Sequence, residues 1–164
     1  MHQSFPNEFP NSIQKPFLRT SPQDVRYNCI GWAFGDNKKF YWPSDFPEYF
    51  WPENVKKEES VDAFIELYES VEYSNCKDGE LEAGYEKIAI FALNGKPTHA
   101  ARQLEDGFWT SKLGSHVDVT HSIQAIEGGM YGDVVQYMKR RIVGASLATD
   151  APVMEEKDFM TIHG

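Results

Sequence analysis

The chain has 164 residues, which is enough for one domain with a substantial core and too few for two. Its hydrophobic content of 41% and charged content of 25% are ordinary for a globular protein, and its net charge of -9 argues against a nucleic-acid partner, because phosphate binding requires a basic face. No stretch approaches the roughly 20 apolar residues of a membrane span. The first residues lack the pattern of a secretory signal, so we expect a cytoplasmic protein, or an effector exported without a signal peptide.

The first third of the chain combines an arm, a helix and an aromatic loop. Residues 1–22 contain repeated prolines and scattered phenylalanines, which indicates an extended N-terminal arm. A helix is expected to begin near Asn28 and to carry Cys29 in its first turn, before Gly35 ends it. In residues 40–56, Trp-Pro pairs prevent a regular helix. This loop is either a lid over part of the core or the aromatic wall of a substrate cleft.

The rest of the chain has one clear helix and then the period of strands. Ser60 is expected to cap an amphipathic helix. Residues 87–93 are apolar on both faces, which indicates a central strand, and Asn94-Gly95 after them is a strong hairpin signal. Further elements are expected over 98–104, 108–113 and 133–139 as strands and over 122–126 as a short helix.

These elements predict an α+β fold in which N-terminal helices pack on an antiparallel meander. We expect residues 1–143 to form a single domain. The tail, residues 144–164, lacks periodicity and is expected to be loosely packed or disordered.

Cys29 and His99 are the candidate reactive pair. The thiolate is the reactive form of cysteine, and a free cysteine has a pKa of about 8.5. A histidine within hydrogen-bond reach can take the thiol proton and later deliver it to a leaving amine. The competing interpretation is that Cys29 is an ordinary core cysteine. The other cysteine, Cys76, lies beside a turn signal, and in a reducing cytosol we expect no disulfide between the two.

The chain resembles the papain-like cysteine hydrolases in the order of its elements. The run Cys29-Ile30-Gly31-Trp32-Ala33-Phe34 looks like the nucleophile helix of that superfamily, and Pro97-Thr98-His99-Ala100 looks like its histidine strand. The compact size is closer to the bacterial cell-wall peptidase branch. The chain also looks like a bacterial domain family with an Asn-Cys-Ile helix and a Thr-His-Ala-Ala-Arg-Gln strand.

This resemblance implies a papain-like fold and a peptidase or deamidase that cleaves an amide bond of a peptide or protein through an acyl-enzyme, without a cofactor. It also implies that Gln23, six residues before Cys29, donates to the oxyanion together with the Cys29 backbone N–H. The alternative is that Gln23 is a polar residue of a turn.

The resemblance further implies a polar residue on the neighbouring strand that orients His99, and its identity depends on one turn. A three-residue loop with left-handed Gly107 places Ser111 diagonally on the face of His99. A two-residue turn places Lys112 there instead. Ser111 can accept from an imidazole N–H and a charged lysine cannot, so we choose Ser111, although such families more often have His, Asn, Asp or Gln.

Other polar and aromatic residues are candidates for binding. Asp118 or His121 could reach His99 as a more distant third member. Together with His116 they also form a His-x-Asp-x-x-His pattern that suggests a metal site, although such residues in a polar loop are more often solvated. A non-catalytic module that grips a partner with the loop at 40–52 is the other alternative. The candidate substrate-binding residues are Trp32, Trp42, Trp51, Arg102 and Gln103.

Overall fold

The fold was described from a computed structural model of the chain. The structure describes residues 2–3, 9–13, 17–21, 29–36, 38–112 and 118–142. Gln23, His116 and the tail from residue 144 lie outside these ranges, so the predictions made for them stay predictions. Within the described residues, no helix is both long and apolar enough to cross a membrane.

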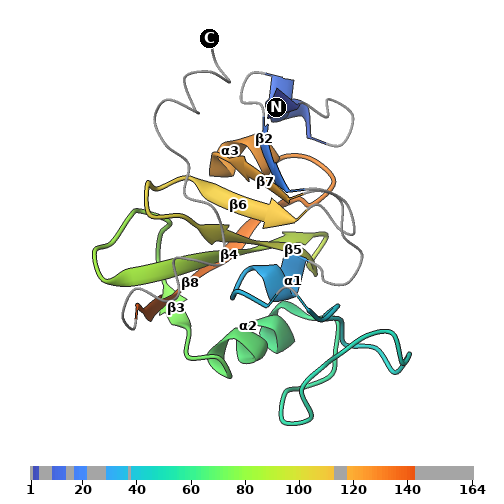
Figure 1. The fold of residues 1–164 in the computed structure, drawn as a ribbon. Coiled ribbons are helices and arrows are strands. Elements are labelled where there is room, and N and C mark those ends of the chain that lie inside the picture. Colours follow the sequence, from blue (N-terminus) through green and yellow to red (C-terminus); the bar gives the residue numbers. More distant parts are fainter. Residues whose placement is uncertain are drawn as a thin grey trace.

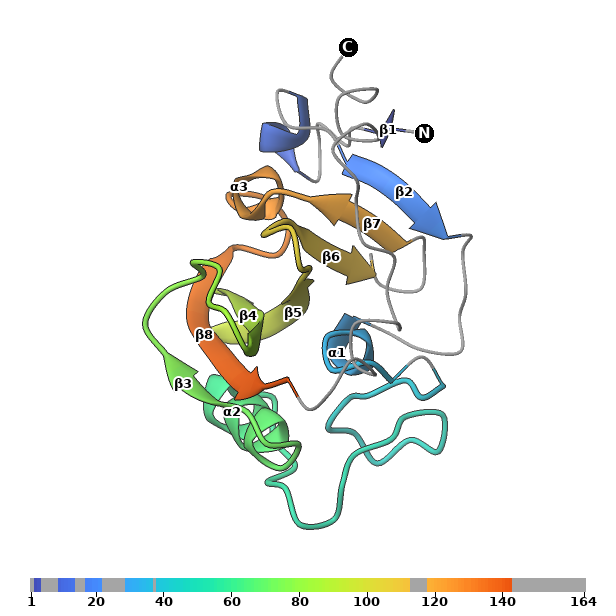
Figure 2. The ribbon, with the colours of Figure 1, turned by 60° about the vertical axis from the view of Figure 1, so that its left-hand side comes forward.

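One antiparallel sheet forms most of the described structure (Figure 1). The strand order is β1-β2-β7-β6-β5-β4-β8-β3, and each neighbouring pair is antiparallel. Figure 2 shows the sheet strongly twisted, with β8 and β3 at one end and β2 at the other. The strands are β1 (His2–Gln3), β2 (Phe17–Ser21), β3 (Ser74–Cys76), β4 (Tyr85–Leu93), β5 (Lys96–Gln103), β6 (Trp109–Lys112), β7 (Asp118–His121) and β8 (Asp133–Arg141).

The helices are short. They are the 3-10 helix η1 (Pro10–Ile13), α1 (Cys29–Trp32), α2 (Val61–Glu69) and α3 (Ile123–Ile126). The predicted cap of α2 is confirmed, because the Ser60 side chain accepts a hydrogen bond from the backbone N–H of Ala63. In α1, the chain turns away after four residues, and Gly35 adopts a φ of 93°, a conformation that favours glycine and ends helices.

The predicted fold class is wrong. The protein is mostly an antiparallel sheet with a few short helices, and it is not a set of N-terminal helices packed on a meander. Two features explain the error. The helix that carries Cys29 has only four residues. In addition, β2 and β7 pair with each other and extend the sheet beyond β6, although neither short polar segment has the apolar alternation that identifies a strand.

The central hairpin forms as predicted. Asn94 and Gly95 connect β4 to β5 with φ values of 53° and 80°, which suit a two-residue hairpin turn. A β-bulge interrupts this pair, because Phe91 lies opposite His99 whereas Ala92 lies opposite Pro97. On the other side of β4, β8 returns as its second neighbour, so β4 is a central strand.

The core lies on both faces of β4. Ile88 and Ile90 belong to a cluster with α1, α2 and the aromatic loop. Ala89 and Phe91 point the opposite way and belong to a second cluster, with residues near η1 and α3. Figure 1 agrees, because α1 and α2 lie on one side of these strands and α3 lies on the other. The sheet is therefore buried on both faces at its centre, which gives polar side chains there a water-poor environment.

Candidate active site

His99 is held in the second cluster by aromatic rings. Its side chain is 0% exposed. The ring of Tyr131 stacks on it with centroids 4.1 Å apart and an angle of 3° between the planes, and Phe91 contacts it edge-on at 5.5 Å. Thr98 fixes this arrangement, because its hydroxyl donates to the Tyr131 carbonyl at 2.6 Å. The imidazole therefore has little freedom to turn.

Gly132 allows Tyr131 to reach this position. Gly132 has a φ of 75°, and a Cβ placed on it would lie 2.0 Å from the carbonyl oxygen of Ala92. Only a residue without a side chain can approach β4 so closely in this conformation. The stacking of Tyr131 on His99 therefore depends on a glycine that sequence reasoning did not single out.

Ser111 lies beside His99, on the neighbouring strand. The pairs Arg102–Thr110 and Gln103–Trp109 give the register of the three-residue loop, and Gly107 has the left-handed φ of 89° that this loop needs. Nε2 of His99 and Oγ of Ser111 are 2.9 Å apart, and Ser111 is 0% exposed. The two-residue turn that would have presented Lys112 is not formed.

His121 lies on a third strand, β7. The side chains of His99, Ser111 and His121 together form a row of polar groups across the three strands, referred to below as the row. Trp109 pairs with His121 and Ser111 pairs with Val119, so β7 brings His121 to the same face as Ser111. Oγ of Ser111 is 2.7 Å from Nε2 of His121, and Nδ1 of His121 is 2.7 Å from the carbonyl oxygen of Ser122. The sequence offered His121 only as a metal ligand or a distant alternative to Ser111, whereas it contacts His99 through Ser111.

Both imidazoles are neutral at neutral pH. Burial lowers the pKa of His99 well below its ordinary value, and the neighbouring His121 lowers it further. Burial also lowers the pKa of His121 to about 4, against a smaller opposing effect of its hydrogen bond to the Ser122 carbonyl. A neutral imidazole has one nitrogen with an available lone pair, which is the form that a general base requires.

Cys29 is the first residue of α1 and is 6% exposed. The helix packs against β5 and β6, and Figure 2 shows it close to the arrowhead of β6. Cys29 belongs to the first core cluster, and the negative charge of its thiolate form also raises the pKa of the Tyr131 hydroxyl, after the larger effect of burial. Cys29 thus packs in the first core cluster, whereas Phe91 and Tyr131, whose rings contact His99, belong to the second.

The backbone around Cys29 is fixed by two contacts from α2 and the aromatic loop. The Tyr68 hydroxyl donates to the carbonyl of Ile30 at 2.9 Å. Tyr41 covers Gly31 so closely that a Cβ there would lie 2.7 Å from its ring. These contacts hold the four-residue helix in place although it is too short to be stable alone.

His99 has one nitrogen left for a partner. Its Nε2 faces Ser111, whereas its Nδ1 is buried and has no hydrogen-bond partner among the described residues. A buried polar atom without a partner costs free energy, and such atoms often mark functional positions. Nδ1 is therefore the atom that a thiol or a substrate would contact.

The aromatic residues predicted to bind substrate lie mainly in the core. Trp42 and Trp51 pack on Phe64 of α2 with ring centroids 5.5 and 5.4 Å apart. Their indole N–H groups donate to the Glu59 carboxylate at 2.7 Å and to the Lys56 carbonyl at 3.0 Å. The loop therefore covers this part of the core. The side chain of Trp32 lies outside the described part of the structure.

Arg102 and Gln103 are also buried, at 5% and 7% exposure. The Gln103 amide donates to the carbonyl of Gly79 at 2.8 Å, which ties β5 to the segment before β4. Burial raises the pKa of the Tyr73 hydroxyl, and the charge of Arg102 is among the groups that oppose this effect. The Gln103 amide is thus hydrogen-bonded to the backbone, and the charge of the Arg102 guanidinium partly offsets the rise in the pKa of Tyr73, a core tyrosine.

Among the described residues, no group of three or more His, Cys, Asp and Glu side chains could hold a metal ion. The described structure therefore offers no set of ligands for the metal-site alternative. Only the backbone of Asp118 is described, as part of β7. A polar cavity lies near the far end of the row, between the loop at 79–80, the turn at 106–109 and Ser122 to Gln124. Neither Cys29 nor His99 lines it.

Comparison with known families decides where the chain belongs. Residues 18–139 match the model of the family described as Domain of unknown function (DUF7689). The chain belongs to this family. The DUF7689 match begins in β2 and ends in β8, so it includes Cys29, His99 and the rest of the row. No curated protein and no solved structure matches the chain.

Proposed function

We propose that this protein is a cysteine hydrolase that cleaves a peptide bond or a side-chain amide through an acyl-enzyme. One observation carries the proposal: His99 is neutral and buried, with Nε2 held by Ser111 and Nδ1 unpartnered within the described structure, and it lies on β5, a strand that the helix beginning at Cys29 contacts. The order nucleophile, base, orienting residue is that of the papain-like hydrolases. The proposal rests on this constellation and not on the papain-like fold, which the protein lacks.

The reaction begins with proton transfer from the Cys29 thiol to Nδ1 of His99, as the sulfur attacks the carbonyl carbon of the amide. The tetrahedral intermediate collapses when the C–N bond breaks, and the imidazolium gives its proton to the leaving amine. A thioester remains on Cys29. Water then attacks the thioester after losing its proton to Nδ1, and the carboxylic acid leaves as the thiolate regains a proton. Gln23 is the proposed oxyanion donor.

The proposed substrate is a peptide or protein, and the net charge of -9 disfavours nucleic acid. Cys29 and Cys76 are both present as thiols, which fits the proposed cytoplasmic location.

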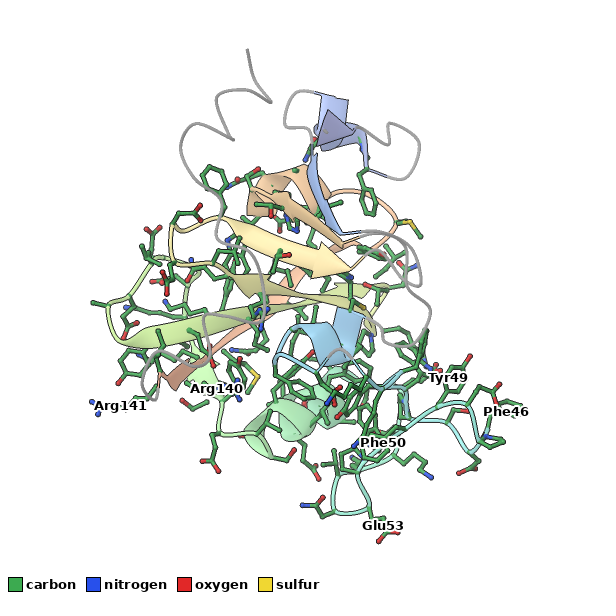
Figure 3. The ribbon with its side chains drawn as sticks, viewed as in Figure 1. Phe46, Tyr49, Phe50, Glu53, Arg140 and Arg141 are labelled. Atoms are coloured by element: carbon green, nitrogen blue, oxygen red, sulfur yellow. The ribbon has the colours of Figure 1, made fainter. Side chains whose placement is uncertain are left out.

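A second candidate function is a binding module without catalysis. The tip of the aromatic loop supports it, because Phe46 is 66% exposed and Phe50 is 37% exposed. Figure 3 shows Phe46 and Tyr49 projecting away from the sheet, at the end of the molecule formed by this loop. In this function Cys29 would be a core cysteine, and a partner would cover the loop tip.

Acyl transfer from p-nitrophenyl acetate separates the two functions, because this small ester acetylates an activated thiol without a matched substrate. We expect a burst of nitrophenolate and one acetyl group on Cys29 by peptide mapping, both lost in Cys29→Ala and His99→Ala. Cys76→Ser is the control and should keep the burst, because Cys76 lies in β3, away from the row. Acetyl groups spread over lysines, or equal acetylation of Cys29 in His99→Ala, would rule the hydrolase out.

A further inference from the structure

The hydroxyl of Ser111 lies between two imidazoles. It is 2.9 Å from Nε2 of His99 and 2.7 Å from Nε2 of His121. A hydroxyl has one hydrogen, so Ser111 can donate to only one of these nitrogens and must accept from the other if both hydrogen bonds form. The directions of both hydrogen bonds therefore follow once the protonated nitrogen of either histidine is known.

The backbone makes that assignment at His121. Nδ1 of His121 lies 2.7 Å from the carbonyl oxygen of Ser122, and a carbonyl only accepts hydrogen bonds. Nδ1 must therefore carry the hydrogen. Because neutral histidine has a single ring N–H, Nε2 of His121 carries a lone pair and accepts from the Ser111 hydroxyl.

The assignment then passes to His99. Ser111 has used its hydrogen on His121, so its oxygen accepts from His99, and Nε2 of His99 must carry the hydrogen. Nδ1 of His99 is left with the lone pair, and it is also the nitrogen without a partner in the described structure. The stacked ring of Tyr131 restrains a ring flip that would exchange the two nitrogens.

We infer that His121 is a positioning residue that sets the tautomer of His99 through Ser111, so that Nδ1 is kept ready to accept a proton. All three side chains are at most 2% exposed, so no bulk water competes for these hydrogen bonds. The catalytic consequence rests on the proposed function, because only a proton donor such as the Cys29 thiol makes use of the lone pair on Nδ1. The tautomer itself does not depend on that function.

Without an acceptor at position 121, the Ser111 hydroxyl is free to donate to Nε2 of His99. The ring hydrogen then moves to Nδ1, and a protonated Nδ1 cannot take the thiol proton. A wrong histidine tautomer costs up to about 10⁴-fold in rate in serine proteases. His121→Leu should therefore slow acetylation of Cys29, and His121→Gln should restore it, because a glutamine carbonyl can accept from Ser111.

The experiment measures the ring ¹⁵N chemical shifts of the histidines by NMR, because protonated and unprotonated imidazole nitrogens have well-separated shifts. In the parent protein we expect hydrogen on Nε2 of His99 and on Nδ1 of His121. His121→Leu should move the hydrogen of His99 to Nδ1, and His121→Gln should not. Thr120→Val is the control, because it removes a buried hydroxyl that has no hydrogen-bond partner in the described structure.

The inference is overturned if His99 carries its hydrogen on Nδ1 in the parent protein, or if His121→Leu leaves it on Nε2. The ring ¹⁵N shifts of the parent protein alone show which nitrogen of His99 carries the hydrogen, so they test the inference even if His121→Leu does not fold. A correct tautomer pattern together with no acetylation of Cys29 would contradict the hydrolase and leave the role of His121 in place. The acetylation rate should fall by about tenfold or more in His121→Leu and stay within about threefold of the parent in His121→Gln.

Discussion

Nε2 of His99 and Oγ of Ser111 lie 2.9 Å apart although twelve positions separate the two residues in the chain. The contact depends on Gly107, whose φ of 89° closes the three-residue loop between β5 and β6. A loop shorter by one residue would turn every side chain of β6 to the other face. One turn therefore decides whether His99 meets a hydroxyl or a different side chain.

Removal of the Ser111 hydroxyl should lower both stability and reactivity. Ser111→Ala takes a hydrogen-bond partner from Nε2 of His99 and from Nε2 of His121, and each unsatisfied buried group costs about 1–3 kcal/mol. We expect the free energy of unfolding to fall by about 2–6 kcal/mol in urea titrations, from the same principle. Thr120→Val provides the comparison and should change stability by less than about 1 kcal/mol, because its hydroxyl is already unpaired within the described structure. If Ser111→Ala is as stable as the parent protein, the hydrogen bonds of the row contribute nothing to the free energy of unfolding.

Gly132 should be intolerant of a side chain. Gly132→Ala places a Cβ 2.0 Å from the Ala92 carbonyl oxygen at a φ of 75°, so the chain must move away from β4. We expect a loss of about 2–5 kcal/mol from overpacking and backbone strain, and weaker stacking of Tyr131 on His99. Gly84→Ala is the matched control, because Gly84 has a similar φ of 83° but no described atom lies within 4 Å of a Cβ placed on it. Gly84→Ala should lower the free energy of unfolding by only about 1–2 kcal/mol. If thermal unfolding shows a similar loss for both substitutions, the close approach of Gly132 to the Ala92 carbonyl is contradicted.

Acid should destabilise the protein before its carboxylates titrate. Burial lowers the pKa of His121 to about 4 and that of His99 well below its ordinary value, so both stay neutral in the folded state. Below about pH 6.5 the unfolded chain binds protons that the folded chain excludes, so the free energy of unfolding falls as pH falls. The decline is at most about 1.4 kcal/mol per pH unit for each histidine, and the share of His121 ends near pH 4.

Urea midpoints between about pH 7 and about pH 5 measure this slope. His121→Gln should reduce it, since glutamine does not titrate. A stability that is flat over this range, or a slope that His121→Gln leaves unchanged, would show that the buried histidines do not carry the effect.

The parts of the fold that the sequence predicted correctly are those with local signals. Asn94 and Gly95 specify a hairpin by their own backbone preferences, and Ser60 caps α2 by a contact three residues away. Burial of β4 on both faces followed from its continuous apolar run. For the strand that carries Ser111, the sequence allows two registers. Each turn type before that strand determines which of its side chains share a face with His99.

The rest depends on long-range pairing. β2 and β7 pair across about a hundred residues, and their short polar sequences carry no sign of a partner. His121 therefore looked like a loop residue, although β7 places it 2.7 Å from Ser111. The fold class is wrong for the same reason, because β1 and β2 lie in the predicted arm and β7 lies in a segment predicted as a polar loop.

The alkylation of Cys29 by iodoacetamide across pH, in a Cys76→Ser background, tests the central claim that Cys29 and His99 form an activated pair. We predict that Cys29 reacts at neutral pH at least about tenfold faster than in His99→Ala, because Nδ1 of His99 takes the thiol proton. Circular dichroism of His99→Ala checks that the variant is folded. If Cys29 titrates as an ordinary thiol and His99→Ala reacts at the same rate over the whole pH range, the two residues are not a catalytic pair and the hydrolase proposal is wrong.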